Sequence, residues 1–117
     1  MTESSALSAE DAKLVALARA TRARTRAAEG AAVRDADGRT YAAASVALPS
    51  LALSALQVCV AMAVASGARG LEAAVLLSDG EAGLADADRA VLTELAGAGV
   101  SVHLGSPAGS VARTVTT

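Results

Sequence analysis

The first pattern along the chain is that of an amphipathic helix. Apolar residues from Leu14 to Thr21 recur at helical spacing. Ser8 can cap this helix, and Glu10 and Asp11 fall in its first turn, where the helix dipole favours acidic side chains. Another side of the helix carries arginines three and four residues apart, namely Arg19, Arg22 and Arg26. The pattern predicts a helix over about residues 8–26.

Two short runs of small and β-branched residues follow this helix. They cover Ala31–Arg34 and Thr40–Val46, and the segment Asp35–Gly38 between them supplies residues that tolerate a left-handed turn. This pattern predicts a β-hairpin. Pro49 and Ser50 then open an uncharged stretch that fits a helix to about residue 66, which the next glycine would end.

The second half of the chain alternates strands with a helix. Leu71–Ser78 holds a continuous apolar run, typical of a strand buried on both faces. Asp86 or Asp88 can start a helix that ends before Gly97, and Val100–Leu104 fits a further strand. Because helices connect successive strands in this order, the sequence predicts an α/β fold with a mixed sheet and helices on both of its faces. We expect one domain over residues 1–117, with loose ends at 1–7 and 106–117.

The composition indicates that the hydrophobic core buries little apolar area. Of the 117 residues 32 are alanine, and Tyr41 is the only aromatic residue. Small side chains bury little apolar area, and each Å² contributes only about 25 cal/mol. We therefore expect a homo-oligomer, either a dimer or a tetramer. We assign the contact to the helix predicted after Pro49, through Leu51, Leu53, Leu56, Val60 and Val64.

Charge and cysteine content indicate which partners and which cellular compartment to expect. A net charge of -2 gives no general attraction to nucleic acid, so we expect no nucleic-acid partner. Cys59 is the only cysteine, which excludes an internal disulfide, and the N-terminus has no basic start of a signal peptide. Residues 40–68 carry no charge, but Pro49 and several polar residues interrupt them. We expect a cytoplasmic protein that does not enter a membrane.

Three segments carry a resemblance to a known family. They are Gly30–Gly38, the uncharged helix that ends at Ala65–Ala68, and Ala74–Gly80. In order and character these segments resemble the small cytidine deaminases, and the likeness extends over about residues 28–104. The resemblance implies a three-layer cytidine deaminase-like fold. It also implies chemistry in which a zinc-bound water attacks the amine-bearing carbon of a pyrimidine while a glutamate moves protons.

The first motif of that family is missing here. It consists of a zinc ligand, an alanine and the catalytic glutamate at the start of the central helix. Counted back from Gly67, the resemblance places these residues on Ser54, Ala55 and Leu56. Counted forward from the hairpin, it places them on Leu56, Gln57 and Val58. Neither alignment gives a metal ligand followed by an acid, because serine is a poor neutral ligand for zinc.

The second motif and the substrate residues are also missing. The two cysteines that the family uses correspond to Ala85 and Asp88, and one carboxylate alone cannot close a zinc site. The positions that hold ribose correspond to Ser45 and Ala47, and the position that stacks on the base corresponds to Ala27. We therefore expect no zinc or other cofactor, no catalytic residue, and no recognition group that would support nucleoside binding.

These absences favour a non-catalytic cytidine deaminase-like protein, a pseudoenzyme that acts as a structural or interaction module. Two alternatives stay open. One is a residual nucleoside deaminase whose rearranged site uses Asp86, Asp88 or His103. The other is an adaptor that binds RNA or phosphate through the arginines of the first helix, although no aromatic residues accompany them to stack on bases.

Overall fold

The computed structural model describes residues 7–80 and 83–117, which form three helices and seven strands. The elements follow the order α1 (Ala9–Thr25), β1 (Glu29–Asp35), β2 (Thr40–Ala44), β3 (Val46–Leu48), β4 (Leu51–Leu53), α2 (Ala55–Ala65), β5 (Leu71–Ser78), α3 (Asp86–Ala96), β6 (Ser101–Gly105) and β7 (Val111–Thr116). The predicted α/β class with helices on both faces of a mixed sheet is confirmed.

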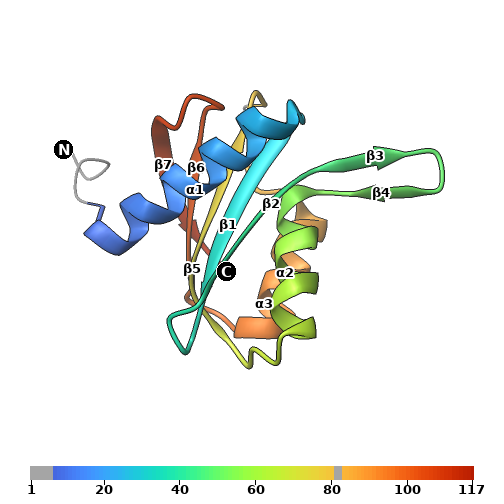
Figure 1. Ribbon diagram of the computed structural model, residues 1–117. Helices are drawn as coiled ribbons and strands as arrows, with labels where there is room; N and C mark the ends of the chain where they lie inside the picture. Colours follow the sequence, from blue (N-terminus) through green and yellow to red (C-terminus); the bar gives the residue numbers. More distant parts are fainter. Residues whose placement is uncertain (1–6, 81–82) are drawn as a thin grey trace.

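Five strands make the central sheet, in the order β2-β1-β5-β6-β7. Only β5 and β6 run parallel, because α3 carries the chain from one to the other, whereas the other neighbours are antiparallel. Helix α1 covers one face of this sheet, and α2 and α3 cover the opposite face (Figure 1). The strand predicted at Leu71–Ser78 is β5, and it lies at the centre.

The two faces of the sheet bury cores of different size. Alternate residues of β5 point to opposite faces, so Leu76 packs with α2 and α3 while Val75 and Leu77 pack with α1. The core under α2 and α3 is the larger one and includes Leu56 and Leu92. Under α1 the helix contributes only Leu14 and Ala18 to the buried cluster. The α1 layer is therefore the thinner of the two.

Close approach compensates for the small side chains beneath α1. A Cβ atom at Gly30 would collide with the carbonyl oxygen of Ala18 and the Cβ atom of Arg22. The absence of a side chain on β1 thus lets the helix backbone rest directly on the strand. Ser8 begins the helix as expected, because its hydroxyl accepts a hydrogen bond from the Asp11 backbone N–H at 3.0 Å.

The hairpin predicted at Asp35–Gly38 is present and is built around a buried carboxylate. Asp35 Oδ1 accepts the backbone N–H groups of Asp37 and Arg39, and Asp35 Oδ2 accepts the Tyr41 hydroxyl at 2.8 Å. Burial raises the pKa of Asp35, but these hydrogen bonds and the Arg39 guanidinium outweigh burial and hold the pKa below its usual value. Gly38 takes the left-handed conformation that the turn requires, with φ at 88°.

The helix predicted to open at Pro49 and Ser50 is wrong at its start. Residues 46–53 form a second hairpin, β3–β4, with Pro49 and Ser50 in its turn, and it projects away from the sheet (Figure 1). Helix α2 begins only at Ala55, because Ser54 and Gln57 form a reciprocal capping box there. The capping pair Ser54 and Gln57, and not Pro49, therefore determines where the helix begins.

This change overturns the proposed oligomer face on one helix. Leu51 and Leu53 lie on strand β4, and Leu56 is fully buried inside the core. Val60 and Val64 do lie on α2, but Val60 is half-buried against the core and only Val64 is exposed, at 55%. The five side chains therefore do not form one helical surface.

The expected loose end at residues 106–117 includes a strand. Residues Val111–Thr116 form β7, which pairs antiparallel with β6 and completes the edge of the sheet. Residues 1–6 of the other expected loose end lie outside the described residues. Within residues 7–80 and 83–117, the structure contains no helix long and apolar enough to cross a bilayer.

Substitution of Gly30 tests the close approach of α1 to β1. We expect Gly30→Ala to lower the free energy of unfolding by about 1–3 kcal/mol, because the new methyl group must push the helix away from the sheet. Gly70→Ala is the matched control, since its Cβ atom would meet only Ala36 at 3.8 Å. Urea denaturation of both variants measures the difference, and equal losses would contradict the packing described here.

Candidate functional site

A cavity of about 330 Å³ lies at the carboxyl end of β5, beside the start of α3. In open α/β sheets this edge is where ligands usually bind. Its lining comes from the start of β1, the end of β5 and the first residues of α3. The lining residues are Ala28, Glu29, Leu76, Ser78, Asp79, Gly80, Gly83, Ala85 and Asp88.

One hydrogen bond connects the starts of α2 and α3 at this cavity. The Ser54 hydroxyl donates to Asp88 Oδ1 at 2.6 Å, although the two residues are 34 positions apart. The same hydroxyl accepts the backbone N–H of Gln57 at 3.1 Å, while the Gln57 side chain accepts the Ser54 N–H. Asp88 is 4% exposed, so its carboxylate lies almost entirely inside the protein. The two helices thus share one polar junction.

Glu29 is the second carboxylate of the cavity, and sequence reasoning missed it. Its Oε1 atom accepts the backbone N–H of Ala55 at 3.1 Å, at the positive end of the α2 dipole. Its own backbone N–H donates to the hydroxyl of Ser45 at 3.1 Å. The sequence pattern placed the strand from Ala31 onward and left Glu29 before it. A lone acid directly before an apolar strand was the available signal.

The structure brings together some of the positions taken from the resemblance and separates others. Ala85 and Asp88 line the cavity, and Ser54 reaches it through its hydrogen bond to Asp88. Leu56 packs in the core under α2 and does not line the cavity. Of the two positions that the resemblance matched to ribose-holding residues, Ser45 contacts Glu29, whereas Ala47 lies exposed on β3. The assignment of family roles to these residues stays a prediction.

The residues at these positions do not fit a zinc ion. The Ser54 hydroxyl uses its proton to bind Asp88, and Ala85 offers no ligand atom. In the part of the chain that the structure describes, no three His, Cys, Asp or Glu side chains group together as a metal site would require.

His103, the histidine of the rearranged-site alternative, lies away from the cavity. It faces α1, where Nε2 contacts Asp11 Oδ2 at 2.8 Å and Nδ1 contacts the Thr114 hydroxyl at 2.8 Å. Burial raises the pKa of Asp11, but hydrogen bonds from His103 and Arg34 outweigh burial and hold it below its usual value. His103 therefore anchors α1 to the sheet and cannot serve a ligand at the other face.

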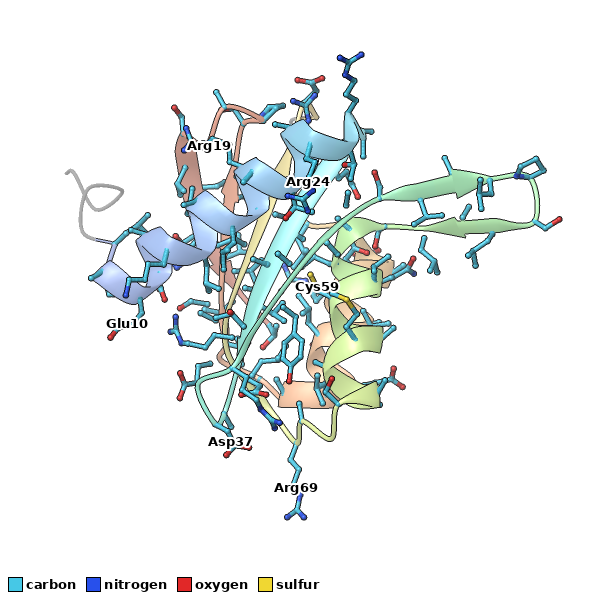
Figure 2. The ribbon with its side chains drawn as sticks, in the orientation of Figure 1. Glu10, Arg19, Arg24, Asp37, Cys59 and Arg69 are labelled. Atoms are coloured by element: carbon cyan, nitrogen blue, oxygen red, sulfur yellow. The ribbon has the colours of Figure 1, made fainter. Side chains whose placement is uncertain are left out.

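Other nucleophilic and charged side chains lie in separate parts of the fold. Cys59 is buried on α2 against the sheet (Figure 2), and burial raises the pKa of its thiol to about 12, which agrees with a packing role. Asp79 lines the cavity and Asp86 is exposed at the start of α3, whereas Glu81 lies outside the described residues. In the first helix, Arg22 donates to the carbonyl of Ala27, while Arg19 and Arg26 are exposed.

Comparison with known proteins identifies the family. The cytidine deaminase-like family model matches residues 7–109. The chain belongs to the cytidine deaminase-like family. Among curated proteins, none matches the sequence significantly.

Solved cytidine deaminases share the fold of this family member. The enzyme from Burkholderia pseudomallei is similar with a TM-score of 0.76 and 25% identity, covering 89% of this chain and 90% of that one. The enzyme from Mycobacterium leprae gives 0.66 and 24% over the same shares. The enzyme from Mycobacterium tuberculosis gives 0.64 and 26%, covering 77% of this chain and 80% of that one.

These matches correct the expectation of a non-catalytic module. Both the family model and the solved neighbours point to a deaminase. The expectation equated loss of the metal-ligand residue types with loss of all site chemistry. The structure instead shows two carboxylates, Glu29 and Asp88, lining one cavity at the carboxyl end of β5.

Substitutions of Ser54 and Asp88 test the junction between the helices. Ser54→Ala removes a helix cap worth about 1 kcal/mol and leaves the buried Asp88 carboxylate without its donor, which costs a further 1–3 kcal/mol or so. Asp88→Asn keeps an oxygen that can accept from Ser54, so we expect a loss below about 1 kcal/mol. Urea denaturation measures both variants, and a larger loss for Asp88→Asn would refute the junction.

Proposed function

We propose that this protein binds a pyrimidine nucleoside in the cavity beside α3 and removes its exocyclic amine by hydrolysis. One observation carries the proposal: Glu29 and Asp88 line a single cavity at the carboxyl edge of the sheet in a member of the cytidine deaminase-like family. Two carboxylates held in different environments are suited to different roles in proton transfer.

The proposed reaction balances without an oxidant or reductant. The oxygen of one water bonds to the ring carbon that bears the amine, and the carbon–nitrogen bond breaks. One proton of that water goes to the ring nitrogen, and the other leaves with the amine as ammonia. A cytidine would thereby become a uridine.

Glu29 is the group that we assign to proton transfer. Its Oε1 atom is held by the Ala55 backbone N–H, and its Oε2 atom makes no hydrogen bond to the residues that the structure describes. Oε2 is therefore available to take a proton from water and return it to the leaving amine. Asp88 is fixed by Ser54 and acts as a positioning residue, because its charge stands beside the same cavity.

Ammonia release from cytidine and deoxycytidine tests the proposal. We expect activity in the purified protein that persists after dialysis against a chelator. Glu29→Gln should lower kcat by about 10²–10⁴-fold, the usual contribution of a positioned acid–base group. Glu94→Gln on the exposed part of α3 is the matched control and should keep full activity. Absence of ammonia release, its loss on chelation, or full activity in Glu29→Gln would each refute the proposal.

We further propose that the protein works in the cytoplasm as a homo-oligomer. Three large apolar side chains on its surface support the second point: Leu48 is 59% exposed, Leu51 is 48% exposed and Val64 is 55% exposed. The first two lie on the β3–β4 hairpin, which carries no charged residue, and a two-stranded hairpin alone is barely stable in water. A second copy covering this hairpin would remove the exposed apolar surface from water.

Sedimentation velocity at micromolar concentration tests the oligomer. We expect a dimer or tetramer for the unaltered chain, and a monomer for the double variant Leu48→Ser and Leu51→Ser. A Leu17→Ser variant is the control, because Leu17 is 39% exposed on α1, away from the hairpin. A monomer in the unaltered chain would exclude the oligomer, and an unchanged oligomer in the double variant would exclude the hairpin as its contact.

A further inference from the structure

The cavity beside α3 continues into a second hollow over β6 and β7. This hollow measures about 410 Å³ and shares Leu76, Ser78, Asp79, Gly80 and Gly83 with the first cavity. Its remaining lining residues are Leu104, Gly105, Ser106, Ala112 and Arg113. The two hollows therefore form one elongated depression, with Glu29 and Asp88 at one end and Arg113 at the other.

Strand register fixes the direction of this depression. Leu76 on β5 pairs with Leu104 on β6, and Leu104 pairs with Arg113 on β7. Residues paired in this way share one face of the sheet, which places Arg113 on the same face as the α3 side of the core. Two strand spacings separate β5 from β7, a distance of about 10 Å. The depression thus crosses the sheet at right angles to its strands.

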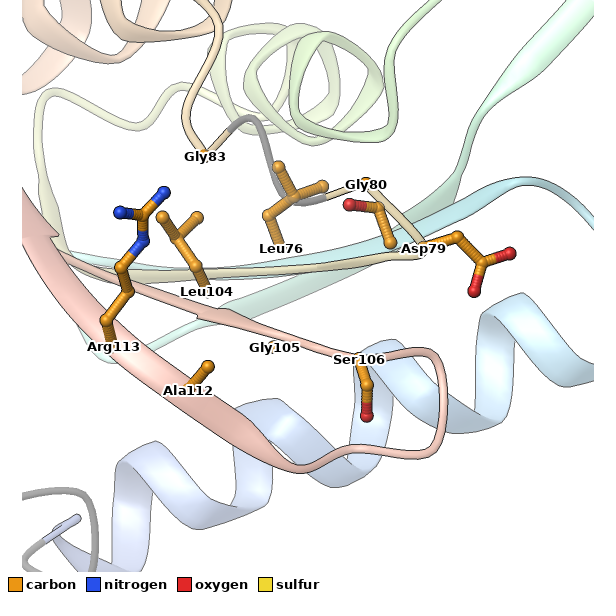
Figure 3. A pocket seen from close by; sticks show the side chains of 10 residues that line it. Leu76, Asp79, Gly80, Gly83, Leu104, Gly105, Ser106, Ala112 and Arg113 are labelled. Atoms are coloured by element: carbon orange, nitrogen blue, oxygen red, sulfur yellow. The ribbon is translucent and has the colours of Figure 1, made fainter.

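Arg113 gives the far end of the depression a positive charge. It makes no hydrogen bond or ion pair with any residue in the described ranges 7–80 and 83–117. Its guanidinium lies against Gly83, where any side chain would collide with it. Figure 3 shows the guanidinium on one side of the hollow and the Asp79 carboxylate on the other, with Leu76 and Leu104 between them. The cation is thus placed at the wall of the hollow.

We infer that the ligand of this site is a pyrimidine nucleoside 5′-monophosphate, with its phosphate at Arg113. The inference rests on the proposed function, because Glu29 and Asp88 place the base. Between the two ends, Ser78 and Asp79 offer a hydroxyl and a carboxylate to ribose hydroxyls. At the far end, a guanidinium matches phosphate oxygens with two parallel hydrogen bonds. The three parts of a nucleotide therefore meet three matching parts of the depression.

A ligand without phosphate would leave half of the depression unused. It would fill the hollow beside α3 and leave the Arg113 guanidinium without a ligand group to bind. The acids at the other end would also repel a phosphate placed there, because Glu29 and Asp88 line that hollow and not the one beside Arg113. The charge distribution therefore allows one orientation of the nucleotide, with its phosphate over β7.

Calorimetric titration of the full chain with three probes tests this inference. The probes are cytidine, cytidine 5′-monophosphate and inorganic phosphate. We expect the monophosphate to bind at least about tenfold more tightly than cytidine, which one charge-assisted hydrogen bond supplies. Arg113→Gln should remove this preference and leave cytidine affinity unchanged, and Arg113→Lys should keep part of it. Arg69→Gln is the control, since this exposed arginine lies at the opposite end of the molecule (Figure 2).

Each outcome decides between the inference and the proposed function. Equal affinity for cytidine and its monophosphate, or a preference that survives Arg113→Gln, overturns the inference even if cytidine is deaminated. Inorganic phosphate that binds as tightly as the monophosphate also overturns it, since the site would then be one for free phosphate. A preference that depends on Arg113, without deamination of either compound, supports the inference while the proposed reaction fails. Binding of none of the probes overturns both.

Discussion

The hydrogen bond between Ser54 and Asp88 holds the starts of α2 and α3 together beside the cavity. It connects the first residues of α2 and α3, which approach the sheet from separate parts of the chain. Because Asp88 is nearly inaccessible to water, its charge needs a donor, and Ser54 supplies one while it caps α2. Glu29 stands on β1, where pairing with β5 places it, and its carboxylate also binds the first turn of α2. The start of α2 therefore contacts both acids, Asp88 through the Ser54 hydroxyl and Glu29 through the Ala55 backbone N–H.

The two layers of the protein are stabilised in different ways. The α2 and α3 layer relies on apolar contacts that include Leu56, Leu76 and Leu92. The α1 layer has little apolar area to bury, so it depends on backbone approach at Gly30 and on the contact between Asp11 and His103. The alanine-rich composition thus does not weaken both faces equally. The α1 side depends more on polar contacts and on close backbone packing, whereas the α2 and α3 side depends on apolar burial.

Most of the architecture could be predicted from the sequence because its strongest patterns are local. The apolar run of β5, the turn at Gly38 and the cap at Ser8 each specify an element by themselves. The β3–β4 hairpin could not be predicted in this way, since Pro49 fits a helix start as well as a turn. The site was harder still. The resemblance gave Ser54 and Asp88 only as positions where the family motifs are missing, and Glu29 and Arg113 lie near them only through sheet register, which a single sequence does not show.

The single parallel pair in the sheet has a consequence for how such a protein changes its chemistry. Where β5 and β6 end side by side, the chain must leave the sheet toward α3 on one side and toward β7 on the other. This divergence opens a hollow regardless of which side chains surround it. Proteins with this fold can therefore exchange the residues that line the hollow one at a time while the hollow keeps a similar shape. The backbone path determines the shape of the hollow, and the side chains that line it determine its chemistry.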